Sequence, residues 1–499
     1  MELPHGRHPD GDHPEHRRLP LLPARPRARH RHDRTEGLMG TPDWVADATF
    51  YQIFPERFAN GDPSLDPPGV EAWGAEPTRE NFFGGDLAGI TAHLDHIEAL
   101  GANAIYLTPI FEADTNHRYD AKDYFAIDHR LGDLSAFQTF LSAAHSRGIR
   151  VVLDAVLNHC GDGHWAFRDV VENERASDYV NWFSVEGFPV SPHPVPNYRT
   201  CSGCYYLPKW NAYNPEVRDH HYEVARYWLE QGIDGWRLDV PYFINHSFWR
   251  GFRNVVKELG DDNYIVAEEW RDPEEWLQGD LADGTMNYTL RDLVLGFTAD
   301  RSLTAGQFAE GMNRLTERIP EGYRTGMLNL LGSHDTERVL TRHRGDHRAA
   351  LLAYALLFSS EGAPMVYYGD EVGLEGENDP GCRGTMPWDE SVWQAELLDE
   401  LRRLAHARKE IRALRRGSQR VAPLGVDTVV VIRTTDSGET AVMIVNRGEP
   451  IAVGRDDLTE LSSAARWSRA DGTAVLSSGE SLTIEARSAL LLTARTDAR

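Results

Sequence analysis

Acidic residues end several short apolar runs of this sequence, and their types and spacing suit acid–base and nucleophilic chemistry. Arg237 and Asp239 are two residues apart, so on a strand their side chains point to the same side. The guanidinium group stays charged and favours the ionised form of its neighbour, which suits Asp239 to act as a nucleophile. Glu268 follows the apolar run 265–267, a setting that favours the protonated form and suits an acid. Two carboxyl groups in unlike environments, with Asp335 as a third acid, describe glycoside hydrolysis through an oxocarbenium-like transition state.

Histidines accompany these acids at the ends of predicted strands. His159 and His334 would form hydrogen bonds with sugar hydroxyl groups, and Asp335 would hold the 2- and 3-hydroxyl groups while the ring distorts. Metal-dependent hydrolysis is the rival interpretation of a cluster of histidines and aspartates. Neither His159 nor His334 belongs to a His-x-x-x-His motif, so the sugar chemistry is favoured.

Eight short strands alternate with amphipathic helices between Trp44 and Arg415, and their carboxyl ends must bring these side chains together. The alternation favours an α/β fold, a (β/α)8 TIM barrel, whose active sites lie at the carboxyl ends of the strands. A doubly wound sheet would produce the same alternation. The predicted strands are Phe50–Phe54, Ala104–Leu107, Arg150–Ala155, Gly235–Val240, Tyr264–Glu268, Thr285–Tyr288, Met327–Leu331 and Pro364–Tyr368. The predicted helices include Leu87–Leu100, Leu134–Arg147, Pro215–Gln231 and Ser247–Leu259.

Two segments depart from this alternation. The stretch after strand 3 is rich in Pro, Tyr, Trp and Gly and too long for an ordinary loop, so we predict an inserted small domain B. After Arg416 the pattern becomes that of a C-terminal antiparallel β-sandwich, with strands at Val426–Arg433, Thr440–Asn446, Pro450–Gly454 and Ser481–Thr493. We therefore assign residues 1–43 to a disordered tail, 44–415 to the catalytic barrel, 160–210 to domain B and 416–499 to the sandwich.

Composition narrows the class of ligand. The 499 residues contain 52 Lys and Arg against 77 Asp and Glu, a net charge of −25, together with 13 Trp, 18 Tyr and 18 Phe. Such an acidic surface repels phosphate backbones and anionic headgroups, so we expect no nucleic acid or membrane partner, and a neutral, hydroxyl-rich ligand fits better. The sequence has no recognisable signal peptide, which predicts a cytoplasmic protein. Cys201 and Cys204 form either a local disulfide or two free thiols.

Four ordered segments resemble the signature segments of glycoside hydrolase family 13, the α-amylase family. They are Asp154–His159 (DAVLNH), Gly235–Asp239 (GWRLD), Val266–Trp270 (VAEEW) and Gly332–Asp335 (GSHD). Further segments are similar to the cyclomaltodextrinase, neopullulanase and maltogenic amylase branch of that family: Phe50–Asp62, Leu207–Asn211, Asn378–Arg383 and Pro387–Asp389. The resemblance covers about residues 44–415 and implies the same barrel, domain B and sandwich.

Carried over by position, the resemblance implies roles for individual residues. Asp239 would be the nucleophile, Glu268 the acid/base and Asp335 the transition-state stabiliser. Glu269 competes for the middle role, but the family places its acid two residues before a tryptophan. Tyr119 would stack under the sugar at the cleavage site; ordinary aromatic packing is the alternative for Tyr119 and Trp270. The resemblance further implies His117, His159, Arg237 and His334 around that sugar, Trp270 and Lys209 on the acceptor side, and Asp379 with Arg383 on the non-reducing side.

The resemblance also implies a structural calcium site. Its oxygen ligands would come from Asn60, Asp62, Asp66, Gly84 and Asp86. Leu65 stands where relatives usually have an asparagine, and a plain Asx turn explains the same residues. Catalysis needs no organic cofactor, because two carboxyl groups and water complete a double displacement.

The leading hypothesis is a retaining α-glucan hydrolase acting on α-1,4, and by extension α-1,6, bonds of maltooligosaccharides, cyclodextrins, pullulan or starch, with glycosyl transfer to sugars. The alternatives are a trehalose- or sucrose-active transferase or isomerase of the same clan, and a non-catalytic carbohydrate-binding relative.

Two features depart from the branch. Pro241, Tyr242 and Phe243 stand where it usually has small and polar residues, and their bulk would narrow the acceptor side or strengthen stacking on glucose. The branch's amino-terminal domain, which helps form its dimer, has no counterpart in residues 1–43, so the oligomeric state stays open.

Overall fold

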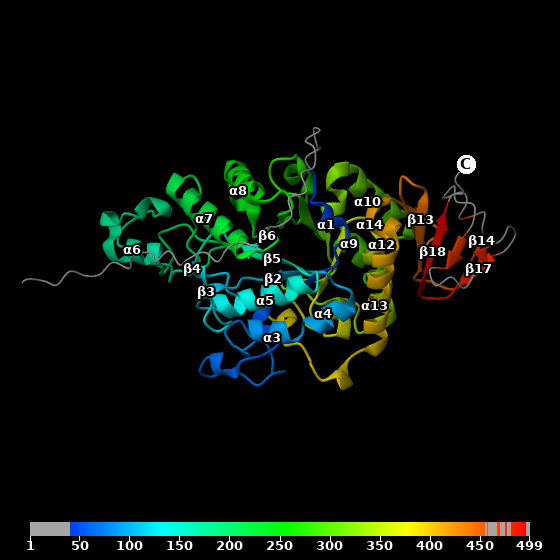
Figure 1. Ribbon diagram of the computed structural model, residues 1–499, viewed down its shortest axis with the longest axis horizontal. Helices are drawn as coiled ribbons and strands as arrows, with labels where there is room; N and C mark the ends of the chain where they lie inside the picture. The colour runs from blue at the N-terminus through cyan, green and yellow to red at the C-terminus, as the bar shows by residue number, and fades with distance from the viewer. Residues whose placement is uncertain (1–39, 455–456, 458–466, 470–474, 477–480, 496–499) are drawn as a thin grey trace, which may run out of the picture. The chain divides into compact units, whose positions relative to one another are not determined.

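The computed structural model describes residues 40–454, 457, 467–469, 475–476 and 481–495. Eight parallel strands close into a barrel in the order β1-β10-β9-β8-β7-β6-β5-β2 (Figure 1). They are β1 (Phe50–Ile53), β2 (Ala104–Leu107), β5 (Arg150–Ala155), β6 (Gly235–Leu238), β7 (Tyr264–Ala267), β8 (Gly284–Asn287), β9 (Leu328–Asn329) and β10 (Ala363–Tyr367). The predicted TIM barrel is confirmed, and the doubly wound alternative is wrong because the sheet closes. Residues 1–39 of the predicted tail lie outside the described residues.

Alternate residues of the barrel strands face inward, which decides which side chains can form a site. Phe50, Tyr106 and Val152 belong to one buried cluster inside the barrel, whereas Tyr51 and Ile105 belong to the cluster that packs against the helices. Because a strand has a period of two, the inward positions continue past the apolar residues to the polar residues at the strand ends. Asp154, Arg237, Asp239 and Glu268, which are described below, occupy these positions.

Most of the longer helices begin at side-chain caps, and the helices surround the barrel. Asn214 caps α7, whose bounds are those predicted, and Pro215 occupies its first turn. The predicted helix Leu87–Leu100 is instead two helices, because the chain leaves helical geometry at His93. The helices are α1 (Asp43–Ala46), α2 (Pro55–Phe58), α3 (Leu87–Ala92), α4 (Leu94–Leu100), α5 (Leu134–Ser146), α6 (Trp165–Asn173), α7 (Pro215–Gln231), α8 (His246–Leu259), α9 (Tyr288–Thr298), α10 (Ala305–Arg318), α11 (Val339–Arg342), α12 (His347–Ser359), α13 (Ala395–Glu410) and α14 (Arg412–Arg416).

Two irregular segments extend from the carboxyl side of the barrel. A hairpin of β3 (Phe111–Ala113) and β4 (Ala121–Ile127) follows β2, and sequence patterns did not predict it. After β5 comes the segment predicted as domain B, which contains α6 and isolated antiparallel bridges instead of long strands. Aromatic packing holds this segment together, as in the stacked rings of Phe183 and Trp210, whose centroids are 4.7 Å apart.

The C-terminal part is antiparallel, as predicted. Its larger sheet has the order β11-β12-β13-β18-β15-β16, and β14 (Ile451–Gly454) pairs with β17 (Ser481–Ile484). Along β12, Val429 and Val431 face the barrel helices, while Val430 packs with residues of the smaller sheet. The predicted strand Ser481–Thr493 is broken at Arg487, whose backbone is left-handed with φ 52°. The larger sheet comprises β11 (Ser418–Pro423), β12 (Thr428–Thr434), β13 (Glu439–Asn446), β18 (Ser488–Arg495), β15 (Trp467–Arg469) and β16 (Val475–Leu476).

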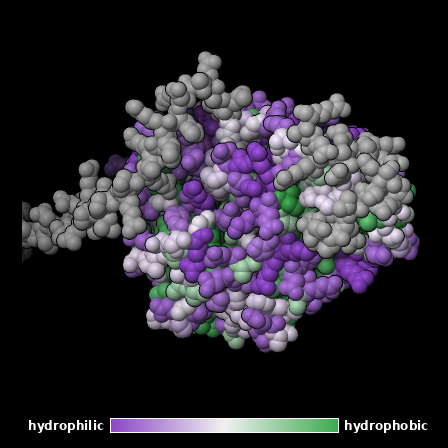
Figure 2. All heavy atoms as spheres, turned by 45° about the vertical axis from the view of Figure 1, so that its right-hand side comes forward, coloured by the Kyte–Doolittle hydropathy of each residue, from purple (hydrophilic) through white to green (hydrophobic). Residues whose placement is uncertain are grey.

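The surface that Figure 2 displays is mostly hydrophilic, with hydrophobic residues scattered among polar ones. Among the described residues, none of the helices has the length and apolar character that a membrane span needs.

Candidate active site

Arg237 is the centre of a polar cluster at the carboxyl end of the barrel. Its fully buried guanidinium group places Nη1 2.9 Å from Oδ1 of Asp154 and 2.9 Å from Oδ1 of Asp239. Its Nη2 lies 2.8 Å from Oε2 of Glu268, and that oxygen also accepts a 2.8 Å hydrogen bond from the backbone N–H of Val240. One cation therefore holds carboxyl groups from β5 and from the ends of β6 and β7 at a single point.

The single positive charge of Arg237 is too little to keep the pKa values of all the buried acids of this cluster low. Burial raises the pKa of Asp239 well above its ordinary value; Arg237 opposes this shift, and the charges of Glu268 and Asp154 add to it. Burial also raises the pKa of Asp154, again against the effect of Arg237. As predicted, Arg237 lowers the pKa of Asp239. The pKa is nevertheless raised overall, because the site is buried and three carboxyl groups share one guanidinium group.

Tyr119 and His334 form one wall above this cluster. The Tyr119 hydroxyl donates to Oδ2 of Asp154 over 2.9 Å and lies 2.5 Å from Nε2 of His334, and the two rings are nearly parallel at 5°. On the other side of the imidazole, Nε2 of Gln52 lies 2.8 Å from Nδ1. Because the amide donates to Nδ1, the hydrogen of His334 stays on Nε2, which faces Tyr119. Gln52 is thus a site residue that the sequence did not reveal.

The hairpin β3–β4 positions Tyr119. Its loop holds Arg118 in a left-handed conformation with φ 60°, and the buried Arg118 side chain forms an ion pair of 3.3 Å with Asp128. Burying this residue inward from the loop directs its neighbours His117 and Tyr119 into the cavity described below.

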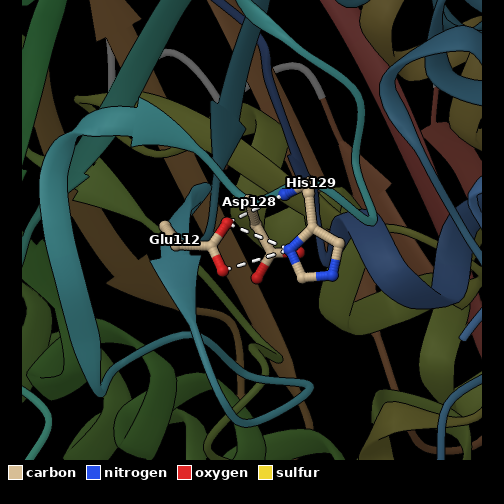
Figure 3. A group of neighbouring side chains, drawn as sticks. All are labelled: Glu112, Asp128 and His129. Atoms are coloured by element: carbon tan, nitrogen blue, oxygen red, sulfur yellow. Dashed lines mark hydrogen bonds and ion pairs between the residues drawn. The ribbon is translucent and has the colours of Figure 1, made fainter. Parts of the chain in front are cut away.

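Figure 3 shows three side chains at the base of this hairpin that resemble a metal-ligand set. Glu112 accepts a 3.0 Å hydrogen bond from the backbone N–H of His129, and its carboxylate also contacts the imidazole. Asp128 accepts hydrogen bonds from Arg130, and despite burial the two arginines lower its pKa to about 2. Because arginine and backbone groups already satisfy these carboxylates, the group anchors the hairpin and is not a metal site.

The histidines of the site are neutral. Burial lowers the pKa of His117 to about 3, with Arg383 adding to the effect, and burial lowers that of His159 to about 4. Burial also lowers the pKa of His334 well below its ordinary value. At neutral pH each imidazole therefore has one donor nitrogen and one acceptor nitrogen and carries no charge.

Asp335 lies beside His334 and is the least buried of the three predicted catalytic acids. Its Oδ2 is 3.2 Å from Nε2 of His334, and its Oδ1 is 3.4 Å from Nη2 of Arg383. Arg383 also pairs with Asp379 over 3.0 Å and donates to the backbone oxygen of His334 over 2.9 Å. The Arg383 side chain is thus held both by the segment that contains His334 and Asp335 and by Asp379 of its own loop.

A cavity of about 810 Å³ joins most of the predicted residues. Eight of them line it: His117, Tyr119, His159, Asp239, Glu268, Asp335, Asp379 and Arg383. Arg237 and His334 are buried and contact these residues directly, whereas Lys209 and Trp270 are not part of the lining. The sequence missed most of the opposite wall, which includes Arg79, Asp114, Tyr205 and Tyr206. Cys201 and Cys204 also line the cavity, and both are free thiols.

Trp270 and Lys209 lie beside Glu268 and the turn after β6. Nε1 of Trp270 donates to Oε1 of Glu268 over 2.9 Å, and its ring stacks on Tyr288 with centroids 3.7 Å apart. Lys209 pairs with His159 in an antiparallel bridge, and its Nζ donates to the backbone oxygen of Phe243 over 2.9 Å. Packing on Tyr288 covers one face of Trp270, in line with the packing alternative.

The residues of the predicted calcium site lie near one another but are partly used by the backbone. Asp86 caps α3 and accepts from the N–H groups of Gly61 and Asp62, and the Asp62 carboxylate caps the turn at Ser64. In contrast, Oδ1 of Asn60 is buried without a partner, and its Nδ2 donates to Asp66 over 2.8 Å. An unpaired buried oxygen is a donor that a hard cation would use.

Comparison with known proteins places the chain among glycoside hydrolases. Residues 52–414 match the family described as alpha amylase, catalytic domain. The chain is 46% identical over 420 residues to a cyclomaltodextrinase from Geobacillus thermopakistaniensis, covering 83% of this chain and 71% of that protein. It is 44% identical over 414 residues to neopullulanase 2 from Thermoactinomyces vulgaris, with 82% and 71% covered.

A solved structure is more similar still. The cyclic α-maltosyl-(1→6)-maltose hydrolase from Arthrobacter globiformis, in complex with that saccharide, is 64% identical and superposes with a TM-score of 0.86. The match covers 91% of this chain and 100% of the solved one. With the barrel, the acid cluster and these relatives together, the chain belongs to the α-amylase family of glycoside hydrolases and to its cyclomaltodextrinase and neopullulanase branch.

Proposed function

We propose that the protein is a retaining hydrolase of α-1,4 and α-1,6 glucosidic bonds in small α-glucans, and that cyclic α-maltosyl-(1→6)-maltose, whose two maltose units are joined by α-1,6 bonds, is its preferred substrate. The observation that carries the proposal is the 64% identity to a hydrolase of that saccharide, matched over its full solved length. The cavity of about 810 Å³ has room for a few sugar rings and is lined by polar and aromatic side chains.

The acids divide the chemistry between them. Asp239 attacks the anomeric carbon while Glu268 gives its proton to the glycosidic oxygen, so the C–O bond breaks and a glycosyl ester forms on Asp239. Glu268 then takes a proton from water, whose oxygen attacks the same carbon and releases Asp239. Oε2 of Glu268 is held by Arg237 and by the backbone N–H of Val240, so Oε1, which accepts only the hydrogen bond from Trp270, is the oxygen that carries the proton.

The other polar residues hold the sugar that is attacked. Asp335 contacts the 2- and 3-hydroxyl groups as the ring distorts, and the neutral imidazoles of His117, His159 and His334 form hydrogen bonds with hydroxyl groups without adding charge. Tyr119 supports the ring from below. Asp379 and Arg383 continue the site toward the non-reducing end, and Lys209 and Trp270 lie on the acceptor side.

The substrate is tested by following products in parallel. Cyclic α-maltosyl-(1→6)-maltose, maltotriose, cyclodextrin and pullulan are incubated with the enzyme, and products are separated by chromatography. We expect the first substrate to give the highest kcat/KM and maltose as end product, released in the α-configuration when followed by NMR. Transfer products with added glucose are expected as a minor fraction, because the ester formed on Asp239 can also react with a sugar hydroxyl group.

Two results would contradict the proposal. Release of a β-anomer would exclude double displacement, and inertness toward all four saccharides would assign the chain to a binding role.

We further propose that calcium binds at Asn60 and Asp66, with Asp62, Gly84 and Asp86 completing the oxygen ligands, and that it fixes the loop before α3. The buried, unpaired Oδ1 of Asn60 supports this proposal. In thermal unfolding, calcium at about 100 times its Kd is expected to raise the midpoint by about 3 °C over EDTA. In Asn60→Ala the difference between calcium and EDTA should vanish. Equal unfolding midpoints of the unchanged protein in calcium and in EDTA would contradict the calcium site. The Asx turn and the helix cap would then fully explain why these residues lie together.

A further inference from the structure

A second cavity, of about 390 Å³, lies where the C-terminal part of the chain meets helices of the barrel. The described residues that line it come from the ends of α9, α11 and α12 on one side, and from the segments just after β13 and just before β18 on the other. There α12 packs against β13 and β18 (Figure 1). None of these residues lines the active-site cavity, so the second cavity is a separate feature of the molecule.

Arginines dominate the described lining of the second cavity. Five arginines line it against one acid, Asp346, so this lining has a formal charge of +4 in a chain whose net charge is −25. His343, which also lines it, is neutral at pH 7, because burial lowers its pKa. A concentration of guanidinium groups in a hollow of an acidic protein indicates a site for an anion. The five are Arg301, Arg342, Arg344, Arg447 and Arg487.

Acidic neighbours hold four of these guanidinium groups in place. Of the four acids involved, only Asp346 lines the cavity, so the other three fix arginines without adding their own charge to the lining. Even with all four acids counted, the arginines are in excess. The side chains are therefore held in place before an anion arrives, which lowers the entropy cost of binding. The pairs are Arg342 with Asp300 and with Glu337, each over 2.8 Å, Arg447 with Asp427 over 2.8 Å, Arg301 with Asp427 over 3.9 Å, and Arg487 with Asp346.

Arg447 is nearly buried and yet incompletely paired. Only 7% of its side chain is exposed. Its Nε donates to Asp427, its Nη1 donates to the backbone oxygen of Phe297, and its guanidinium carbon lies 4.2 Å from the centroid of the Phe297 ring. Its Nη2 has no partner among the described residues, so this is the nitrogen that the residue offers to the cavity. A donor in a cavity wall without a partner is a contact that an anion would complete.

Arg344 is the arginine of this lining whose side chain forms no ion pair or hydrogen bond with the described part of the chain. Its backbone is left-handed, as are those of Arg301 and Arg487, with φ of 54°, 54° and 52°. This conformation favours glycine and is unfavourable for a long side chain. Three arginines of one cavity thus keep an unfavourable backbone, which points to a role of their side chains in binding.

We propose that the second cavity binds a phosphate group, with room for an attached sugar. A guanidinium group donates two parallel hydrogen bonds to a pair of phosphate oxygens. A phosphate has three terminal oxygens to share between Arg344 on the barrel side and Arg447 on the C-terminal side, whereas a carboxylate has two in one plane. The volume lies within the range of small-molecule sites and is more than a bare phosphate fills. Ala299, Ala349 and Leu352 supply apolar lining for the remainder.

Binding is measured on the full chain by isothermal titration calorimetry and thermal unfolding, with no saccharide substrate present. The probes are inorganic phosphate and glucose 6-phosphate, with glucose and with sodium chloride of equal ionic strength as references. We expect both phosphates to bind and to raise the unfolding midpoint by about 3 °C at about 100 times their Kd. Tighter binding of glucose 6-phosphate would identify a sugar phosphate as the ligand, and equal affinities would identify free phosphate.

Arg344→Gly removes a guanidinium group at a position whose backbone suits glycine. It should lower the affinity for both phosphates by about 10-fold and leave the midpoint without phosphate nearly unchanged. Arg348→Ala is the matched control, because Arg348 is an exposed arginine in the first turn of α12 that does not line the cavity, and it should change the affinity less than about 2-fold.

Two results would overturn the inference. Sodium chloride could reproduce the effect of phosphate, or Arg344→Gly and Arg348→Ala could weaken binding equally. Either result would assign the effect to the general charge of the surface. Because the measurements need no hydrolysis, neither result bears on the proposed function.

Discussion

Asp239→Asn is expected to lower kcat/KM by roughly 10⁴-fold or more, because an amide cannot form the glycosyl ester of a double displacement. The same change should not lower the thermal unfolding midpoint. Burial raises the pKa of Asp239, so its ionised form opposes folding in this environment, and an asparagine oxygen can still accept the 2.9 Å hydrogen bond from Arg237. Loss of activity with unchanged or increased stability is the signature of a residue kept for chemistry.

The measurement is the release of fluoride from α-maltosyl fluoride together with circular dichroism melting. Glu269→Gln is the matched control for the acids at these strand ends: Glu269 follows Glu268 directly, but its carboxylate accepts from the buried Trp276 over 3.0 Å. We expect Glu269→Gln to retain activity within a few-fold. Turnover by Asp239→Asn within 10-fold of the unchanged enzyme would remove Asp239 from the role of nucleophile.

The barrel and its acids could be predicted because both follow from local patterns. A strand has a period of two, so Arg237 and Asp239 had to share a face, and most predicted strands agree with the structure to within one or two residues. Gln52 and Tyr106 occupy equivalent inward positions on β1 and β2. An amide or a phenol in an apolar strand is not unusual, however, and only the contacts across the barrel with His334 and Asp154 show what they do.

The surroundings of Tyr119 depend on contacts between distant residues and could not be predicted. Its direction follows from the left-handed backbone of Arg118 and from the buried ion pair of Arg118 with Asp128, which lies at the base of the hairpin, ten residues further along the chain. The hairpin itself has register shifts and no Asn-Gly or Asp-Gly turn, so it lacks the usual sequence signal. The resemblance to the α-amylase family therefore predicted Tyr119, and the contacts of Arg118 explain its position.

The residues after β5 that line the cavity could not be predicted from the sequence for a related reason. Tyr205 and Tyr206 lie in a segment held by isolated bridges and aromatic packing, in which no period of two or 3.6 marks one face. The sequence also did not show how many carboxyl groups share the charge of Arg237. A sequence shows that Arg237 is near Asp239, but only the closed barrel brings Asp154 and Glu268 to the same guanidinium group.

Arg237→Ala is expected to destabilise the protein by roughly 3–5 kcal/mol at pH 8, because it leaves three buried carboxyl groups without a cation. The loss should shrink as the pH falls. Burial already raises the pKa values of Asp154 and Asp239 above their ordinary values, and removing the guanidinium group raises them further. The folded variant therefore binds more protons than the unfolded chain, from the ordinary aspartate pKa of about 4 up to the raised values. Across that window its stability falls as pH rises.

Urea unfolding at pH 5.5 and pH 8 measures the effect, with Arg338→Ala as the matched control. Arg338 is as deeply buried as Arg237 but pairs with a single acid, Asp370, whose pKa burial raises to about 7. Its variant should show the same sign of pH dependence with a smaller slope, since one carboxyl group with a raised pKa, that of Asp370, loses its cation instead of two, those of Asp154 and Asp239. Adding Asp154→Asn to Arg237→Ala should recover part of the stability at pH 8 and little at pH 5.5. An equal loss at both pH values would mean that packing, and not the shared charge of the three acids, makes Arg237 necessary.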